Sequence, residues 1–219
     1  MARPRTSKGR AREAVARLNA EYPGSAAELC ALIHSVPFQL LVATILSAQT
    51  TDERVNLVTP VLFGRYPTPC DLAGADPDEL EAIIQSTGFF RNKSRSLVGM
   101  ARALGDGCDG EVPRRMEDLV TIPGVGRKTA NVVRSVACGL PGLPVDTHVG
   151  RLSLRLGLTE AHDPVKVELE LNTMVPAAER GGFSLRLILH GRRVCTARRP
   201  RCGDCMMNDF CPSAGKFVA

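Results

Sequence analysis

The feature that most constrains the fold is a tight turn between two helix-like segments, near the start of residues 119–148. The turn reads Pro123-Gly124-Val125-Gly126, and apolar residues flank it at helical spacing in the pattern L-x-x-I-P-G-V-G-x-x-x-A. Its glycines permit backbone dihedrals that other residues avoid, and they let another backbone or a ligand come close. The pattern therefore predicts a helix–hairpin–helix whose second helix begins near Arg127.

The turn also has the features of an anion site. At a helix N-terminus, unpaired N–H groups and the helix dipole favour a negative charge. We therefore interpret Gly124, Val125, Gly126 and Arg127 as a grip on DNA phosphates that requires no particular base sequence. Such a turn can also be structural punctuation, and many DNA-binding modules without catalysis share it, so the pattern alone leaves these interpretations open.

Two side chains near the turn suggest covalent chemistry. Lys128 falls in the first turn of the second helix, and Asp146 follows in the segment V-D-T-H. An amine and a carboxylate beside a phosphate site indicate nucleophilic chemistry on a nucleic-acid backbone. The amine must be neutral to attack, and we expect burial and the helix N-terminus to favour the neutral form. A solvated Lys128 is the alternative. We expect His148 to contact a phosphate or to orient Asp146, with a buried capping histidine as its alternative.

Four of the eight cysteines fall near the C-terminal end with the spacing C-x6-C-x2-C-x5-C: Cys195, Cys202, Cys205 and Cys211. Four thiolates in so short a segment can close around one metal centre, and soft sulfur ligands suit zinc or an iron–sulfur cluster. Disulfides are the alternative, but the chain shows no secretory signal, so we expect reduced cysteines. The spacing does not distinguish zinc from iron.

The charge distribution favours a nucleic-acid partner. The formal net charge is only +5, but basic residues cluster in two places. Five of them precede Glu13, and five arginines fall within residues 192–201. Such clusters are typical of nucleic-acid binding. A disordered, solvated tail is the alternative for the N-terminal cluster, and we expect residues 1–9 to be disordered. Because no apolar run reaches 18 residues, we expect no transmembrane helix.

Hydrophobic periodicity and capping signals predict an all-α fold, since we find no convincing segment of period two. Outside the hairpin, helices are expected at about residues 9–20, 25–33, 38–48, 52–65, 76–86, 92–104, 147–156, 164–174 and 183–194.

Four motifs together carry a family resemblance. LVTIPGVGRKTANVV, VDTHV, TILSAQTTD and the cysteine spacing occur in one chain, and it resembles endonuclease III from about residue 12 to 212. The resemblance implies a [4Fe–4S] cluster rather than zinc. It also implies two helical domains with the DNA cleft between them. One is a six-helix barrel at residues 30–140 that carries the hairpin, and the other is a cluster domain formed by residues 1–29 and 141–219.

The same resemblance implies roles for individual residues. Lys128 matches the family's nucleophile, Asp146 its catalytic carboxylate, and Gln49 the side chain that fills the gap left by the flipped base. The segment Gly88–Ser94 resembles a second DNA wedge, so Phe89 and Phe90 are also candidate DNA contacts. Here Phe90 and Arg91 replace the tyrosine and asparagine that are usual in that loop.

The activity implied by the resemblance is base excision repair of oxidised pyrimidines, with abasic-site (AP) lyase activity by β-elimination through a lysine Schiff base. The expected partner is double-stranded DNA with damaged bases or abasic sites, bound by a cytoplasmic, nucleoid-associated monomer.

Two other functions compete with this one. The adenine-specific relative shares the cluster, but it lacks a lysine at the position of Lys128 and carries a glutamate in the segment that matches Thr44–Gln49. That segment has no acid here. Both differences favour the bifunctional pyrimidine enzyme. The other competitor is a non-catalytic helix–hairpin–helix DNA-binding protein.

Overall fold

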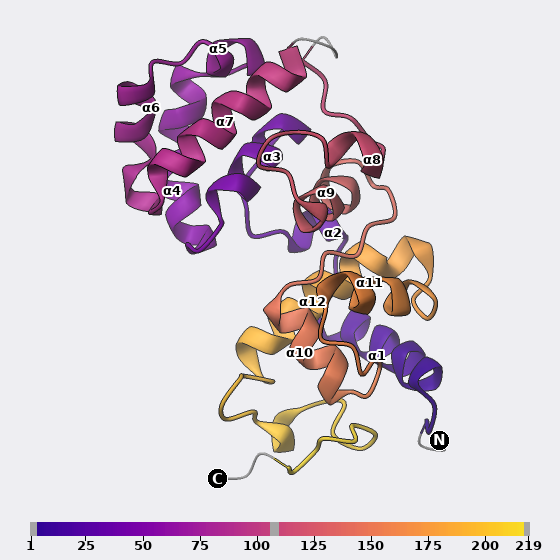
Figure 1. Cartoon of the computed structure of the whole chain (residues 1–219). Helices are drawn as coiled ribbons and strands as arrows, with labels where there is room; N and C mark the ends of the chain where they lie inside the picture. Colours follow the sequence, from indigo (N-terminus) through magenta and orange to yellow (C-terminus); the bar gives the residue numbers. More distant parts are fainter. Residues whose placement is uncertain (1–3, 106–109, 217–219) are drawn as a thin grey trace. The chain divides into compact units, whose positions relative to one another are not determined.

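The computed structural model describes residues 4–105 and 110–216, and every regular element in these ranges is helical (Figure 1). The all-α prediction is therefore confirmed. The chain forms two compact units. One is Cys30–Gly139, and the other contains the chain up to Leu29 and again from Leu140 onward.

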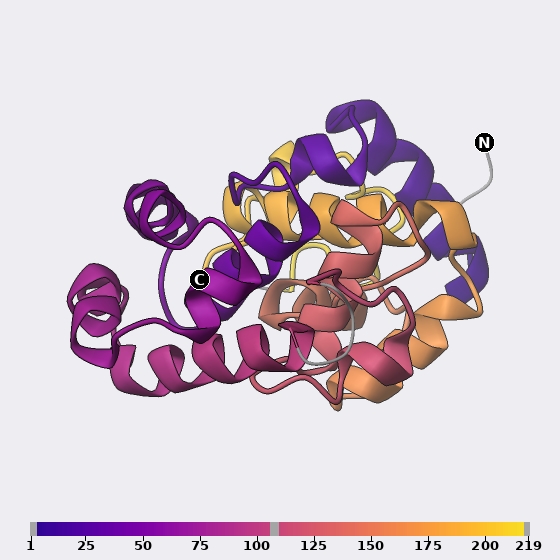
Figure 2. The same cartoon turned by 90° about the horizontal axis from the view of Figure 1, so that it is seen from above.

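The unit Cys30–Gly139 is built around α3, an apolar helix with Pro37 at its first position and buried side chains along most of its length. Proline suits this position because its fixed φ is helical and no N–H is needed there. The long helix α7, magenta in Figure 2, packs against α5, α6 and α3. The elements of this unit are α3 (Pro37–Leu46), α4 (Asp52–Arg65), α5 (Pro69–Ala73), α6 (Pro77–Ile84), the 3-10 helix η1 (Gln85–Thr87), α7 (Phe90–Gly105), α8 (Met116–Leu119), α9 (Arg127–Val132) and the π-helical η2 (Val133–Ala137).

The other unit joins the N-terminal helix to the last third of the chain. Its apolar core includes Leu18 of the first helix, Leu152 of α10 and Phe183 of α12. Helix α12 packs against both α10 and α1. The elements are α1 (Ser7–Glu21), α2 (Ala26–Leu29), α10 (Thr147–Arg155), α11 (Pro164–Asn172), the 3-10 helix η3 (Ala177–Glu179), α12 (Arg180–Arg193) and the 3-10 helix η4 (Cys202–Asp204).

Near the N-terminus two expectations are wrong. Residues 7–9 are helical, because the Thr6 side chain accepts a hydrogen bond from the Gly9 N–H at 3.1 Å and caps α1. Residues 1–3, which belong to the same expectation of disorder, lie outside the described residues. Helix α2 ends at Leu29 instead of continuing to residue 33. The Asn56 side chain bonds the Ile33 N–H and the Ala31 carbonyl, at 2.9 and 2.8 Å, and so takes backbone groups that a longer helix would use.

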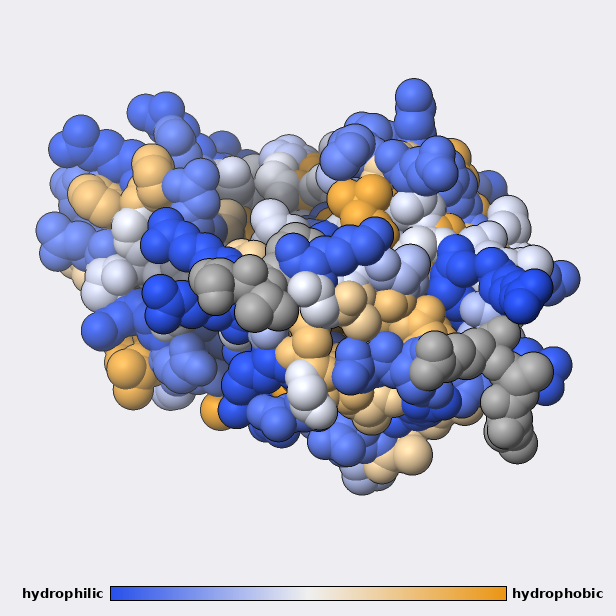
Figure 3. All heavy atoms as spheres, turned by 90° about the horizontal axis from the view of Figure 1, so that it is seen from below, coloured by the Kyte–Doolittle hydropathy of each residue, from blue (hydrophilic) through white to orange (hydrophobic). Residues whose placement is uncertain are grey.

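The surface seen in Figure 3 is largely covered by hydrophilic residues, with smaller apolar areas between them. Across the described part of the chain, no helix combines the length and the hydropathy needed to cross a bilayer.

Candidate functional site

The hairpin turn is held by hydrogen bonding and close packing. Val125 is only 4% exposed, and its N–H donates to the Ile122 carbonyl at 3.0 Å. Gly124 has φ 79, and a Cβ there would lie 2.8 Å from the Ser96 Cβ, so a larger residue does not fit. Gly126 precedes α9, and a Cβ there would meet nothing within 4 Å. Within the turn, Gly124 and Val125 therefore have structural roles, whereas Gly126 leaves open space beside the helix N-terminus.

Helix α9 presents its first turn to this open space. Its first intrahelical bond runs from the Ala130 N–H to the Gly126 carbonyl at 2.9 Å. The N–H groups of the preceding first turn therefore have no acceptor within the helix. Lys128 is the second residue of α9, and its side chain is exposed. The expectation that Lys128 is buried is therefore wrong, and the alternative, a solvated side chain, is the one that the structure shows.

A groove in the unit Cys30–Gly139 runs from the hairpin to the segment before α7. It is lined by ten residues: Thr44, Ile45, Ala48, Gln49, Phe89, Asn92, Lys93, Ser96, Gly124 and Thr129. Gln49 is exposed in the loop between α3 and α4, and Phe89 is 64% exposed. Phe90 begins α7, half-buried, with the Arg91 guanidinium 5.7 Å from its ring centre. The structure thus brings Gln49 and Phe89 together with the hairpin at one groove, and Phe90 is not among its lining residues.

Asp146 lies in the other unit, as the N-cap of α10. Its Oδ1 accepts a hydrogen bond from the Val149 N–H at 2.8 Å, and the residue is half-buried. Val145 before it is buried. Asp146 therefore has a structural function besides any chemical one, since its carboxylate orders the first turn of α10.

His148 is half-buried and packs against α12. Its Nδ1 lies 3.1 Å from an Nη of Arg151, and a Cβ at Gly191 would lie 2.8 Å from the same Nδ1. Burial is the main cause that lowers the pKa of His148, while the Asp146 charge acts in the opposite sense. These contacts are closer to the expected alternative, a packed histidine, than to a solvent-facing phosphate ligand.

Two arginines of α10 connect this helix to the cysteine segment. Arg151 donates to the Gly191 and Cys195 carbonyls at 3.1 and 3.0 Å. Arg155 donates to the Cys195 Sγ at 3.3 Å and to the Thr196 carbonyl at 2.7 Å. The helix that Asp146 caps therefore also fixes the start of the cysteine segment.

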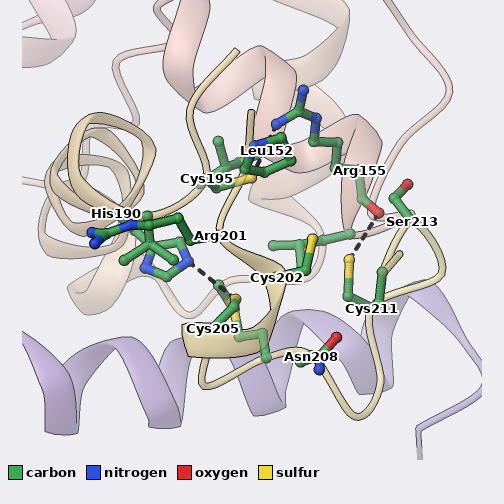
Figure 4. A pocket seen from close by; sticks show the side chains of 15 residues that line it. Leu152, Arg155, His190, Cys195, Arg201, Cys202, Cys205, Asn208, Cys211 and Ser213 are labelled. Atoms are coloured by element: carbon green, nitrogen blue, oxygen red, sulfur yellow. Dashed lines mark hydrogen bonds between the residues drawn. The ribbon is translucent and has the colours of Figure 1, made fainter. Parts of the chain in front are cut away.

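All four candidate cysteines line one cavity, together with apolar side chains such as Leu152 and Val194 (Figure 4). Around them, His190 Nε2 lies 3.3 Å from the Cys205 Sγ, and the Tyr22 hydroxyl lies 3.1 Å from the other nitrogen of the same ring. Burial lowers the pKa of His190 to about 4, so the ring is neutral at physiological pH.

The chemistry of this cavity fits an iron–sulfur cluster. Burial raises the pKa of Cys205 to about 11 and also raises the pKa of Cys211. Bound metal ions reverse this preference, because their positive charge stabilises thiolates. Soft sulfur donors, hydrogen bonds to the sulfurs and an apolar surround are the features that hold and tune such clusters.

The N-terminal helix also supports the cysteine segment. Arg17 of α1 donates to the Met206 carbonyl and to both carboxylate oxygens of Asp209, and its guanidinium lies 5.1 Å from the Phe210 ring centre. Sequence reasoning missed this support, as it missed His190, Arg151 and Arg155. Their roles depend on contacts between segments far apart in the chain, so the helical pattern alone gave no signal.

Comparisons with known proteins agree with the geometry. Residues 42–177 match the model of the HhH-GPD superfamily of base excision DNA repair proteins, and residues 195–211 match the iron-sulfur binding domain of endonuclease III. The chain is 54% identical to endonuclease III of Synechocystis sp., over 95% of this chain and 94% of the relative. It is 38% identical to endonuclease III of Escherichia coli K12, over 94% and 96% of the two chains.

Solved structures give the same result. A non-covalent endonuclease III–DNA complex matches with a TM-score of 0.88 and 41% identity, covering 95% of this chain and 97% of that one. A trapped covalent endonuclease III–DNA intermediate matches with a TM-score of 0.88 and 42% identity. The cofactor is a [4Fe–4S] cluster, in agreement with the matched iron-sulfur domain and the cysteine-lined cavity. By sequence, by fold and by the arrangement of its hairpin and cysteines, the chain belongs to the endonuclease III family.

Proposed function

We propose that this chain releases oxidised pyrimidines from double-stranded DNA and then cleaves the abasic site, with Lys128 as the nucleophile. As a member of the endonuclease III family, the chain is a DNA glycosylase with AP lyase activity. The proposal adds the lesion class and the residues. Its main support is the position of Lys128, an exposed amine on the second residue of α9, beside the first-turn N–H groups of the hairpin.

In the first step the hairpin holds a phosphate while the damaged nucleotide leaves the stack. A base inside a duplex does not present its C1′ to a nucleophile, so the nucleotide must be flipped out, at a cost of a few kcal/mol. Lys128 Nζ then forms a bond to C1′ as the bond from C1′ to the base breaks. The base leaves with one proton of the amine. The C1′–O4′ bond then breaks, the second amine proton passes to O4′, and the C1′=N bond of the Schiff base forms.

In the second step the Schiff base acts as the electron sink. Loss of a proton from C2′ places the electron pair in a C2′–C3′ double bond, and the C3′–O bond breaks with release of the phosphate. Since Lys128 is exposed in the free protein, we propose that bound DNA removes water from its side chain before the amine attacks.

We assign the catalytic carboxylate to Asp146. It stabilises the positive charge that develops on the sugar as the base leaves, or accepts a proton at that step. Because its Oδ1 already bonds the Val149 N–H, the carboxylate is held in a fixed orientation before substrate binds. Preorganisation of this kind lowers the cost of charge stabilisation in the transition state.

Gln49 and Phe89 are proposed to enter the duplex from their shared groove. Gln49 fills the space of the flipped base, and the Phe89 ring wedges the opposite strand. Their exposure and their place beside the hairpin support this assignment, whereas Phe90 is half-buried at the start of α7. Cys195, Cys202, Cys205 and Cys211 are proposed to hold the cluster, whose role is to stabilise the fold of its unit. We place the enzyme in the cytoplasm with the nucleoid, as a monomer.

Borohydride trapping on abasic duplex DNA tests the central assignment. The parent should leave protein covalently attached to DNA, because borohydride reduces the Schiff base. Lys128→Ala should bind with similar affinity and give no adduct. Lys166→Ala is the matched control, since Lys166 is also an exposed lysine in the first turn of a helix, α11.

Trapping by Lys128→Ala at the parental level would show that Lys128 is not the nucleophile. Release of adenine opposite oxidised guanine without trapping would identify the adenine-specific enzyme instead. Binding without release or trapping would identify a non-catalytic module.

A further inference from the structure

Lys93 is a buried lysine of the segment Gly88–Ser94, and the proposed chemistry gives it no role. Its side chain lines the groove from α7 and is only 5% exposed. Burial lowers its pKa. Moving an ammonium group out of water costs several kcal/mol, and an apolar side chain of similar length would fill the same space without this cost. The residue must therefore gain something from its charge or its hydrogen bonds.

The hydrogen bonds of Lys93 enclose the segment that presents Phe89. Its Nζ donates to the Thr87 carbonyl at 2.7 Å, and its backbone N–H donates to the Phe89 carbonyl at 3.1 Å. Between these two carbonyls the backbone has φ 70 at Gly88 and φ 49 at Phe89. One residue thus holds both ends of a short segment in an unusual conformation.

The exposed ring contributes little to holding this segment. With 64% of Phe89 exposed, packing against the protein gives only part of the stabilisation that a buried ring would give. The other end of the segment is anchored by Thr87, which is 1% exposed and whose hydroxyl donates to the Ile84 carbonyl at 2.8 Å. Hydrogen bonds from Thr87 and Lys93 therefore fix the segment.

The position of the Thr87 carbonyl explains why an ammonium suits this role. Thr87 is the last residue of η1, which directly follows α6. Carbonyls at a helix C-terminus lack intrahelical partners and lie at the negative end of the dipole, where a cation is favoured. A charge-assisted hydrogen bond is also roughly twice as strong as a neutral one.

We propose that Lys93 is a positioning residue for base extrusion: its ammonium holds the Thr87–Phe89 backbone so that the Phe89 ring stands in the groove, ready to enter the DNA stack. The inference rests on the wedge role of Phe89 proposed above. Lys93 acts through the Thr87 carbonyl rather than through DNA, because its ammonium donates to that carbonyl and the residue is only 5% exposed.

A comparison of two variants and their combination tests this inference. Lys93→Met keeps the length of the side chain and removes its donor and its charge. Single-turnover base release from damaged duplex should fall roughly tenfold in this variant, the change equivalent to losing one charge-assisted hydrogen bond. The rate of base release should fall at least as far in Phe89→Ala. The double variant should be no slower than Phe89→Ala, because residues that act through one another are not additive.

Two further measurements exclude a general loss of structure. Borohydride trapping on single-stranded abasic DNA requires no wedge, and Lys93→Met should trap at the parental level. Hydrogen exchange should be faster at the amides of residues 88–93 in Lys93→Met than in the parent. Arg102→Met is the matched control, since it removes an exposed cation from the same helix away from the groove.

The possible outcomes distinguish a failure of the wedge role of Phe89 from a failure of the positioning role of Lys93. If Phe89→Ala releases base at the parental rate, the wedge role of Phe89 is wrong and the inference falls with it. If Phe89→Ala is slow but Lys93→Met is not, or if their effects add, the wedge role stands and the inference about Lys93 is overturned. Equal loss of base release and single-stranded trapping in Lys93→Met would also overturn it, because that result indicates a general structural role.

Discussion

Gln49 and Phe89 share two properties: their φ values of 57 and 49 are positive, and both residues line the groove beside the hairpin. Among the described residues they are the only non-glycine residues with positive φ. Each such conformation costs on the order of 1–3 kcal/mol, and exposed side chains recover little of this through burial. Strain is thus retained at the two positions proposed to enter DNA, where a preset side-chain direction has a use.

Because the backbone at Gln49 is strained, substitutions there should affect stability and activity differently. Gln49→Gly and Gln49→Ala both remove the side chain that fills the gap, so both should release base more slowly from intact damaged duplex. Gln49→Gly should be more stable than Gln49→Ala by about 1 kcal/mol, since glycine has no Cβ to disfavour positive φ. Chemical unfolding and single-turnover assays measure the two effects. Cleavage of a pre-formed abasic site should change little, and equal loss on both substrates would instead place Gln49 in the chemical site or the fold.

The variants Asp146→Asn and Asp146→Ala distinguish the helix-capping function of Asp146 from its proposed catalytic function. Asn is as good an N-cap as Asp, so Asp146→Asn should unfold at the parental midpoint, whereas Asp146→Ala should lose about 1 kcal/mol. Both variants should bind DNA and lose base release, with a smaller effect on the lyase step, where no glycosidic bond remains to break. Normal base release by Asp146→Asn would remove the carboxylate from the mechanism.

Alanine substitution at the two hairpin glycines should have different effects on stability and on DNA affinity. Gly126→Ala places a methyl group in space that the protein leaves empty, so its stability should hold while its affinity falls for every DNA sequence. Gly124→Ala should lose stability, because its Cβ meets Ser96 and its φ is positive. Fluorescence anisotropy over a salt series gives the affinities, and the parent should show a steep log–log slope set by its phosphate contacts. A flat slope, or a loss of affinity confined to some sequences, contradicts the phosphate grip.

The cluster prediction concerns stability more than chemistry. Purified protein should be yellow-brown and contain about four irons per chain. Cys202→Ala should lower the iron content, the soluble yield and the unfolding midpoint, with a smaller effect on trapping by the fraction that stays folded. Iron analysis, absorbance spectra and thermal unfolding measure these changes. Colourless, folded protein that contains one zinc would contradict the assignment.

Local signals predicted much of the fold. The helices predicted from about residues 76 and 164 begin there, capped by Asp76 and Asp163, because capping depends on a few adjacent residues. The expectations were wrong where tertiary contacts determine the end of a helix. The Asn56 side chain, for example, hydrogen-bonds backbone groups that a longer α2 would use. The short helix α5 was missed although its signal was present, a capping box between Thr68 and Asp71.

The site was predictable to the extent that chemistry needs particular side chains in particular motifs. Lys128, Asp146 and the cysteines were named from their motifs, but the exposure of Lys128 was considered only as the alternative to its burial. The burial of Lys93 and the positive φ of Gln49 had no sequence signal. Lysine is rarely buried, and a left-handed conformation is read from a sequence chiefly through glycine or asparagine.

The unit formed from both ends of the chain has a consequence for the order of events during synthesis. Residues 30–139 are contiguous and can fold as soon as they leave the ribosome, since domains fold as units during translation. Helix α1 emerges first, but the residues that its Arg17 binds, Met206 and Asp209, lie 189 and 192 positions later. The apolar face of the first helix must therefore wait for α10 and α12, and Arg17 must wait longer still, until the cysteine segment has been translated. The unit that contains the four cysteines is therefore the last of the two to be completed.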